Sequence, residues 1–370
     1  MSMTLKSDAP IVTENVARLK PYHPGKPIEE VQRELGLTDI IKLASNENPL
    51  GPSPKALEAM QAAINKVALY PEGAAPVLRA MLAKIHGISE DSLVFGNGSD
   101  EILHLVCATF LAPGKDSTVQ ADPTFAMYEI YATLADAEVV KVPLVNYTHD
   151  LDAMADAVTD KTRIVFIANP NNPTGTLVTQ RQVERFLNRL PERVILVSDE
   201  AYDDYVESPE KPNLLPFVKE RRNVIISHTF SKVHALAGLR VGYAMAPPAM
   251  AGYMNRARSP FNVNLVGQAA AVASLGDTEH VRVSVALNSA EKRRIYAALE
   301  KEHIQFVQSE ANFVLIDVER DSREVFDLLL RCGIIVRAGY ALGLPNHIRV
   351  TIGTPDQNTR FLTELLAVMR

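Results

Sequence analysis

The sequence contains no tryptophan, only two cysteines and no long uninterrupted hydrophobic run. A membrane-spanning helix needs about 18 or more consecutive apolar residues, so we expect no transmembrane segment and no membrane partner. Residues 1–20 are mixed and polar, without the apolar core of a signal peptide. We therefore expect a cytoplasmic protein.

The few cysteines and the lack of excess positive charge exclude further classes of protein, namely disulfide-bonded proteins, metal-binding proteins and general nucleic-acid binders. Cys107 and Cys332 lie far apart in apolar sequence, which favours buried, unpaired thiols in a reducing compartment. The nine histidines form no close cluster with cysteine, so we expect no metal site. A net charge of −6 gives no general affinity for nucleic acid, so local arginines must bind any anion.

The length of 370 residues suits a large domain with a smaller partner. From residue 92 to 228, solid apolar runs such as 162–168 and 194–197 alternate with helical patterns. This alternation is typical of parallel strands that helices cover on both faces. We predict an α/β fold with a mostly parallel central sheet in a large domain and a small α+β domain. The predicted boundaries are 1–45 for an N-terminal arm with part of the small domain, 46–250 for the large domain and 251–370 for the small C-terminal domain.

The most informative stretch surrounds Lys232, which follows the apolar run 223–226 among small and apolar neighbours. Partial desolvation there would lower the pKa of the amine and make it a nucleophile toward aldehydes. Thr229, Ser231 and Arg240 supply the donors that a phosphate monoester needs. Together they indicate an imine with pyridoxal 5′-phosphate. The alternative is a surface lysine on a loop beside a structural arginine.

Other polar groups fall where such a cofactor needs partners. The turn at 96–101 opens an apolar helix, and backbone N–H groups at a helix start bind anions, although ordinary glycine turns are common. Asn172, Asp199 and Lys232 all follow predicted strands, so they can converge at one edge of the sheet. Asp199 can pair with the ring nitrogen, Asn172 and Tyr202 with the phenolate oxygen, and Phe125 can stack on the ring. The phosphate candidates are Ser99, Asp100, Thr229, Ser231, Arg240 and Tyr70.

Four motifs resemble the fold-type-I aminotransferases, in matching order over nearly the whole chain. They are Gly96 to Glu101, Asn169 to Gly175, Ser198 to Tyr202, and Thr229 to Lys232 with Arg240 eight residues on. The resemblance implies a pyridoxal-phosphate-dependent transaminase with Lys232 as its catalytic residue. It also implies a homodimer in which Tyr70 reaches the cofactor phosphate of the other subunit.

Within that group, further stretches resemble the histidinol-phosphate aminotransferases. They are Pro21 to Lys26, Ala44 to Pro54, Tyr70 to Gly73, Ala235 to Arg240, and Val336-Arg337 with His347 to Gly353. The resemblance implies ping-pong transfer from L-histidinol phosphate to 2-oxoglutarate, giving imidazole-acetol phosphate and L-glutamate in histidine biosynthesis. Arg349 would hold the substrate phosphate, assisted by Arg337, Tyr22 and Asn46. Phe125 departs from the tyrosine often found at the stacking position, so a hydroxyl contact is lost there.

Three alternatives remain at this stage. An aromatic amino-acid aminotransferase would use the same arginines on a carboxylate. A pyridoxal-phosphate-dependent threonine-phosphate decarboxylase would release CO₂ without an oxo-acid partner. A cofactor-binding regulator would carry an added DNA-binding domain, and the chain has neither a basic segment nor spare length for one.

Overall fold

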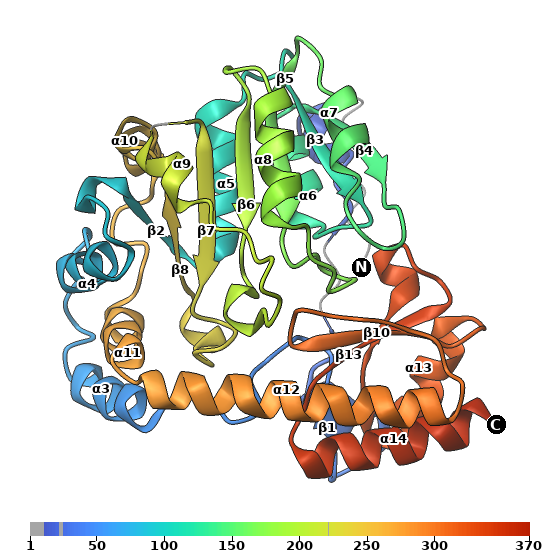
Figure 1. The fold of residues 1–370 in the computed structure, drawn as a ribbon. Coiled ribbons are helices and arrows are strands. Elements are labelled where there is room, and N and C mark those ends of the chain that lie inside the picture. The colour runs from blue at the N-terminus through green and yellow to red at the C-terminus, as the bar shows by residue number, and fades with distance from the viewer. Residues whose placement is uncertain (1–10, 22–24, 221) are drawn as a thin grey trace.

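The computed structural model describes residues 11–21, 25–220 and 222–370. Its larger part is a seven-stranded sheet in the order β2-β8-β7-β6-β5-β3-β4 (Figure 1). Neighbouring strands from β4 to β7 are parallel, whereas β8 runs antiparallel to both β2 and β7. The predicted mostly parallel sheet is confirmed. The strands are β2 (Leu93–Asn97), β3 (Ser117–Asp122), β4 (Glu138–Pro143), β5 (Thr162–Ala168), β6 (Ile195–Asp199), β7 (Val224–Thr229) and β8 (Val241–Met245).

Helices cover both faces of this sheet because its strands are apolar on both sides. Ile195 and Val197 of β6 pack into one core, and Leu196 packs into the other. The first core includes α5 (Ser99–Phe110), α6 (Met127–Leu134) and α10 (Pro248–Ala257). The second includes α3 (Pro54–Ile64), α4 (Pro76–His86), α7 (Leu151–Asp156), α8 (Gln180–Arg189), α9 (Leu215–Lys219) and α11 (Leu265–Leu275). Each fully buried aliphatic side chain contributes about 1.5–3 kcal/mol to this packing.

A smaller unit follows the sheet and lies below it on the right in Figure 1. Its antiparallel sheet has the order β12-β13-β10-β9, and a separate parallel pair joins β1 to β11. The long helix α12 runs below the large sheet, from near α3 into the smaller unit, where α14 lies below it. The elements are β1 (Ile41–Lys42), α12 (Thr278–Lys301), β9 (Phe306–Val307), β10 (Phe313–Asp317), α13 (Ser322–Arg331), β11 (Ile334–Ile335), β12 (Arg337–Ala338), β13 (His347–Thr351) and α14 (Pro355–Met369).

The N-terminal residues contact both parts. Helix α1 (Glu14–Ala17) lies against α6, where the Asn15 amide donates a 2.8 Å hydrogen bond to the Leu134 carbonyl. Helix α2 (Ile28–Leu35) ends at Gly36, whose φ of 68° is the left-handed conformation that glycine adopts at helix ends. Val31 of α2 packs on Ile335 of β11. Short 3₁₀ turns complete the fold: η1 (Glu90–Ser92), η2 (Asp203–Tyr205), η3 (Ala237–Leu239) and η4 (Gly339–Leu342).

The two cysteines are free thiols in different surroundings. Cys107 is buried in α5, and burial raises its pKa to about 12. Cys332, at the end of α13, is partly exposed, so the expectation that both are buried was wrong for this residue. The exposure follows from its position at the C-terminal end of a surface helix. Among the described helices, none combines the length and the apolar character that crossing a bilayer requires.

Candidate active site

A pocket opens at the carboxyl ends of the parallel strands, where ligands bind in open α/β sheets. It brings together all the predicted site residues except Tyr22 and Tyr70. They are Asn46, Ser99, Asp100, Phe125, Asn172, Asp199, Tyr202, Thr229, Ser231, Lys232, Arg240, Arg337 and Arg349. The lining also includes residues that sequence reasoning did not select: Gly25, Ala44, Ser45, Tyr128, Ala168, Pro170 and Ala201.

Lys232 enters this pocket from the loop that follows β7. Its Nζ donates a 3.2 Å hydrogen bond to the Ser45 carbonyl and lies 5.5 Å from the centre of the Tyr202 ring. Burial and, to a lesser extent, the positive charge of Arg349 together lower the pKa of Lys232 to about 8. Part of the amine population is therefore neutral, and hence nucleophilic, near neutral pH.

Asp199 is the last residue of β6 and is almost fully buried. Burial raises its pKa to about 6, opposed by a 2.8 Å hydrogen bond from the Tyr128 hydroxyl to Oδ2. Oδ1 is buried and has no hydrogen-bond partner among the described residues. A buried acceptor without a partner is costly, so this oxygen fits a protonated ring nitrogen. Tyr128 was not selected as a site residue from the sequence. Its position three residues after Phe125 could have indicated it, because side chains at this spacing point to the same side of a helical turn.

The start of α5 and Arg240 form an anion cradle. Gly98, with a φ of 80°, leads into the helix, whose first turn carries Ser99 and Asp100. Free backbone N–H groups and the helix dipole favour an anion there. Arg240 donates 3.4 Å hydrogen bonds to Asp100 and to the Ser231 hydroxyl.

Glycine is required on both sides of this cradle. A Cβ on Gly98 would lie 2.3 Å from the Arg240 guanidinium. A Cβ on Gly242 would lie 2.4 Å from the backbone nitrogen of Ser99. Only glycine therefore lets β8 and its arginine approach the start of α5.

A second network surrounds the Tyr202 hydroxyl, which accepts hydrogen bonds from the amides of Asn46 at 2.9 Å and Asn172 at 3.3 Å. Arg349 donates to the Asn172 side chain at 2.5 Å and to the Ala44 carbonyl at 2.8 Å. Segments that follow β1, β5 and β6 therefore meet at one phenol, and Arg349 of the small sheet joins them through Asn172. Burial raises the pKa of Tyr202, so its hydroxyl stays protonated and remains able to donate.

Two arginines reach the pocket from the small sheet. Arg337 of β12 and Arg349 of β13 are directly paired in the antiparallel register, so their side chains share one face of that sheet. A groove continues from them along α6 and is also lined by Phe125, Ile130 and Tyr340. The groove shares Phe125, Asn172, Arg337 and Arg349 with the pocket that holds Lys232.

Two predicted residues stand apart. Tyr22 lies outside the described residues. Tyr70 is 81% exposed, stacks on Phe261 with 4.7 Å between ring centres, and does not line the pocket of its own chain.

The donor set fits pyridoxal 5′-phosphate. Lys232 offers a desolvated amine, and Asp199 offers a buried oxygen without a partner. The start of α5 with Arg240 offers a phosphate cradle. Phe125 lines the pocket as a ring on which a pyridine can stack.

Comparisons with known proteins agree with this geometry. The family model described as "Aminotransferase class I and II" matches residues 38–365. The histidinol-phosphate aminotransferase of Moorella thermoacetica is 50% identical over 361 residues, which cover 97% of this chain and 93% of the relative. That of Symbiobacterium thermophilum is 47% identical over 354 residues, 96% of this chain and 97% of the relative.

A solved structure agrees as well. The crystal structure of histidinol-phosphate aminotransferase from Sinorhizobium meliloti in complex with pyridoxal-5′-phosphate is 26% identical, with a TM-score of 0.90. The match covers 100% of this chain and 99% of that one. The chain therefore belongs to the class I and II aminotransferases, as a member of the histidinol-phosphate aminotransferase family.

Proposed function

We propose that this enzyme uses pyridoxal 5′-phosphate to transfer the amino group of L-histidinol phosphate to 2-oxoglutarate. The products are imidazole-acetol phosphate and L-glutamate, and the reaction belongs to histidine biosynthesis. The observation that carries the proposal is the placement of Arg337 and Arg349, paired across β12 and β13, in one pocket with Lys232. The names of close relatives support the same substrate.

The two arginines favour a phosphorylated substrate over an amino acid. A phosphate monoester is close to a dianion at neutral pH, and two guanidiniums match its charge and its several acceptor oxygens. A carboxylate, as in an aromatic amino acid, is satisfied by one forked contact. Asn46, and Tyr22 by resemblance, complete the proposed substrate contacts. The decarboxylase alternative also takes a phosphate, but the relatives described above are named as aminotransferases.

Each remaining pocket residue has a proposed task toward the cofactor. When bound, the cofactor supplies an electron sink that weakens the bond between the substrate α-carbon and its hydrogen. Lys232 would take this proton from the substrate α-carbon as general base and would return it as general acid. Asp199 holds the proton on the ring nitrogen, while Asn172 and Tyr202 face the phenolate oxygen. Phe125 stacks on the ring, and the phosphate contacts are Ser99, Asp100, Thr229, Ser231, Arg240 and Tyr70.

A panel of amino donors tests the proposed reaction. The purified enzyme is supplied with 2-oxoglutarate and either L-histidinol phosphate, L-histidinol, phenylalanine or threonine phosphate, and glutamate and CO₂ are measured. Loss of the phosphate contacts should lower kcat/KM for histidinol by about 100-fold or more relative to histidinol phosphate. A higher kcat/KM for phenylalanine, or CO₂ release without glutamate, would contradict the proposal.

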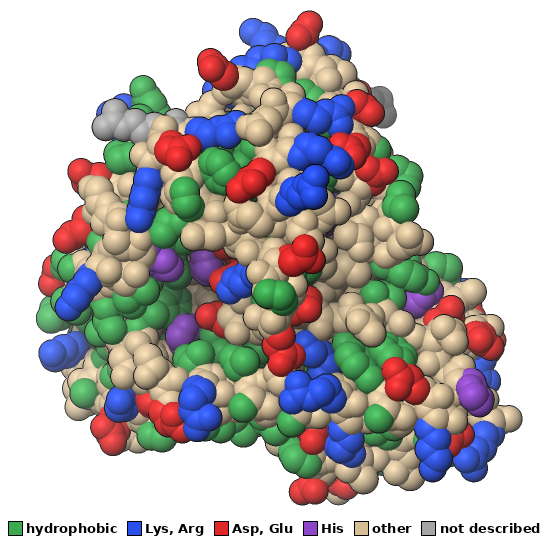
Figure 2. All heavy atoms as spheres, viewed as in Figure 1, with side chains coloured by type: hydrophobic (Ala, Val, Ile, Leu, Met, Phe, Trp, Pro, Cys, Tyr) green, Lys and Arg blue, Asp and Glu red, His purple; other side chains and the backbone are tan. Residues whose placement is uncertain are grey.

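A homodimer is part of the proposed function. Apolar side chains gather over α3, α4 and α11 at the left edge of Figure 2. The exposed ones in this region, each at least 45% exposed, include Leu57, Ile64, Val67, Leu69, Tyr70, Val77 and Phe261. An exposed apolar patch of this kind marks an interaction surface. A second copy of the chain is the proposed occupant, because Tyr70 lies outside its own pocket and would add a hydroxyl to the partner's phosphate cradle.

A cytoplasmic location completes the proposal. Both cysteines are free thiols, as is usual in a reducing compartment. Fractionation of the producing cells, followed by assay of each fraction, checks the location.

A further inference from the structure

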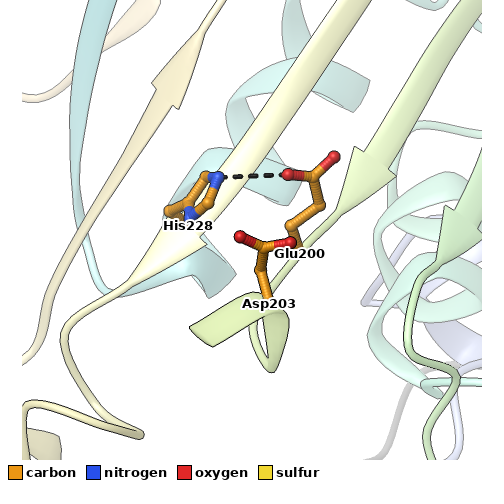
Figure 3. A group of neighbouring side chains, drawn as sticks. All are labelled: Glu200, Asp203 and His228. Carbon is orange, nitrogen blue, oxygen red and sulfur yellow. Dashed lines mark ion pairs between the residues drawn. The ribbon is translucent and has the colours of Figure 1, made fainter. Parts of the chain in front are cut away.

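A polar cluster lies behind the candidate active site, on the side of β6 and β7 away from Asp199. It consists of Glu200, Asp203 and His228 (Figure 3). His228 Nε2 is 3.2 Å from Glu200 Oε2, and the two side chains are only 15% and 11% exposed. Figure 2 shows histidine side chains gathered at a hollow on this face, near the lower ends of β7 and β8. The proposed reaction uses none of these three residues.

The cluster already contains its own cations. Ligand atoms of the three residues lie within 4.8 Å of one another, a spacing that also suits a divalent metal. However, Asp203 forms a 2.7 Å ion pair with Lys211. Burial lowers the pKa of His228, but the hydrogen bond and negative charge of Glu200 outweigh burial and raise it overall. Lys211 and a histidine that hydrogen-bonds to Glu200 therefore already occupy the two carboxylates, so these pairings explain the cluster better than a metal does.

The pair is joined directly to the pocket through the backbone. Glu200 follows Asp199, and His228 precedes Thr229. Because successive side chains of a strand point to opposite faces, the pocket residues point one way and the ion pair points the other. The Glu200 backbone nitrogen donates a 2.9 Å hydrogen bond to the Ser227 carbonyl, so backbone and side chains both tie the two strand ends together.

Further contacts hold each partner in place. The Ser198 hydroxyl donates to Glu200 Oε1 at 2.9 Å. The His228 ring stacks on Tyr243 of β8, with 5.3 Å between ring centres and an angle of 12°. The Tyr243 hydroxyl in turn lies 3.0 Å from Nε2 of His86 on α4. Three neighbouring strands and one helix therefore fix the geometry of the pair.

We propose that the ion pair between His228 and Glu200 is a positioning element that fixes the strand ends carrying Asp199 and Thr229 toward the cofactor. Withdrawing two charges from water offsets most of the attraction between them, so a buried pair adds little net stability. Its effect lies in geometry, because binding groups must be held within about half an ångström of their productive positions. The inference rests on the proposed contacts of Asp199 and Thr229 with the cofactor.

Binding of pyridoxal 5′-phosphate to the apoenzyme tests this inference. The variants are His228→Gln, Glu200→Gln and their combination, and the readouts are Kd and the visible circular dichroism of the bound cofactor. Each single change should raise Kd about 10-fold, the scale of other supporting contacts to a binding site. The double variant should be no worse than either single variant, because the two residues act as one unit. His228→Arg, which retains a cation, should restore most of the affinity and the wild-type dichroism.

Controls separate this role from general loss of stability. Arg189→Gln on α8 removes the exposed ion pairs with Asp152 and Asp156 of α7; none of these residues lines the pocket, so Kd should stay unchanged. Thermal unfolding of each apo variant measures folding independently. Losses that add in the double variant, or Kd values within twofold of wild type, would overturn the inference.

Two further outcomes would also overturn it. Micromolar Zn²⁺ binding to the wild-type apoenzyme that disappears in His228→Gln would identify a metal site instead. Unchanged cofactor affinity in both Asp199→Asn and Thr229→Ala would show that these two residues do not contact the cofactor, as the inference requires. That outcome would not decide the substrate, which the panel of amino donors tests separately.

Discussion

The hydroxyl of Tyr128 donates a 2.8 Å hydrogen bond to one carboxylate oxygen of Asp199, while the other oxygen has no hydrogen-bond partner among the described residues. Tyr128 is itself fully buried and stacks on Phe166, with 4.8 Å between ring centres, so it fixes the carboxylate from a rigid position. The carboxylate is thus oriented before any ligand arrives, and Asp199 lines the same pocket as Lys232. Such pre-organisation reduces the conformational entropy that is lost when the cofactor binds.

Removing the Asp199 charge should stabilise the apoenzyme and impair the loaded enzyme. Burial raises the pKa of Asp199 from 3.8 to about 6. A raised acid pKa means that the folded state prefers the protonated form, so stability falls as pH rises from about 4 to about 6. Over two pKa units this amounts to about 2–3 kcal/mol. Asp199→Asn should therefore raise the Tm of the apoenzyme above pH 6 and lower kcat with bound cofactor at least about 100-fold.

Thermal unfolding of both apoproteins between pH 4 and pH 8 checks the sign of this effect. Asp152→Asn, which changes an exposed carboxylate on α7, serves as the control. An apoenzyme that gains stability from pH 4 to pH 6 relative to Asp199→Asn would contradict the assignment of the raised pKa.

Lys232→Ala should abolish the reaction. The variant lacks both the amine that reacts with the cofactor aldehyde and the base that moves the α-proton, so kcat should fall by about 10⁴-fold or more. The visible absorbance of the covalently bound cofactor should disappear as well. Lys161→Ala, at a mostly exposed lysine, provides the matched control. Retention of both turnover and absorbance would remove Lys232 from the site.

The capture of the cofactor by the apoenzyme should depend on pH through Lys232. Burial and the positive charge of Arg349 together lower the pKa of this amine to about 8. The rate of absorbance growth should therefore rise with pH and reach half its maximum near pH 8, since only the neutral amine reacts. Arg349→Gln should move the midpoint to higher pH because a repelling cation is gone. A wild-type midpoint near pH 10 would mean that Lys232 is not desolvated in solution.

Replacing the paired arginines should affect the phosphate end of the substrate. Arg349→Gln and Arg337→Gln should each raise KM for histidinol phosphate about 10- to 100-fold, the range for a lost charge-assisted hydrogen bond. The KM for unphosphorylated histidinol should change far less. Arg282→Gln, which removes an exposed pair with Glu279, is the control. Equal effects on the two substrates would place the phosphate elsewhere.

Strand order explains which pocket residues could be predicted from the sequence. Asn172, Asp199 and Lys232 each follow an apolar run, and the carboxyl ends of parallel strands share one edge of a sheet, so their meeting was foreseeable. The hydrogen bond from Tyr128 could not be predicted, because the sequence pattern of a tyrosine on an apolar helix face indicates only a core residue. The antiparallel strand β8 was also missed, since Gly242, which lets it approach Ser99, interrupts its apolar pattern.

Contacts between distant segments could not be read from the sequence. The pairing of His228 with Glu200 joins two strands, and no spacing rule indicates it. The individual roles of the pocket residues stay predictions, as does the division of the chain at residues 45 and 250. Local patterns identify candidate groups and the edge they share, whereas orientation depends on packing between elements.

Hybrid dimers provide the sharpest test of Tyr70. Subunits carrying Lys232→Ala are mixed with subunits carrying Tyr70→Phe, and hybrids are isolated by two affinity tags. If Tyr70 serves the partner's phosphate cradle, the site that retains Lys232 receives an intact Tyr70 from the other subunit. In the Tyr70→Phe homodimer, the Kd for pyridoxal 5′-phosphate should be about 10-fold higher than in the wild type. In the hybrid, the Kd of this site should return to the wild-type value. If the hybrid keeps the weaker Kd, Tyr70 acts within its own subunit or on stability alone.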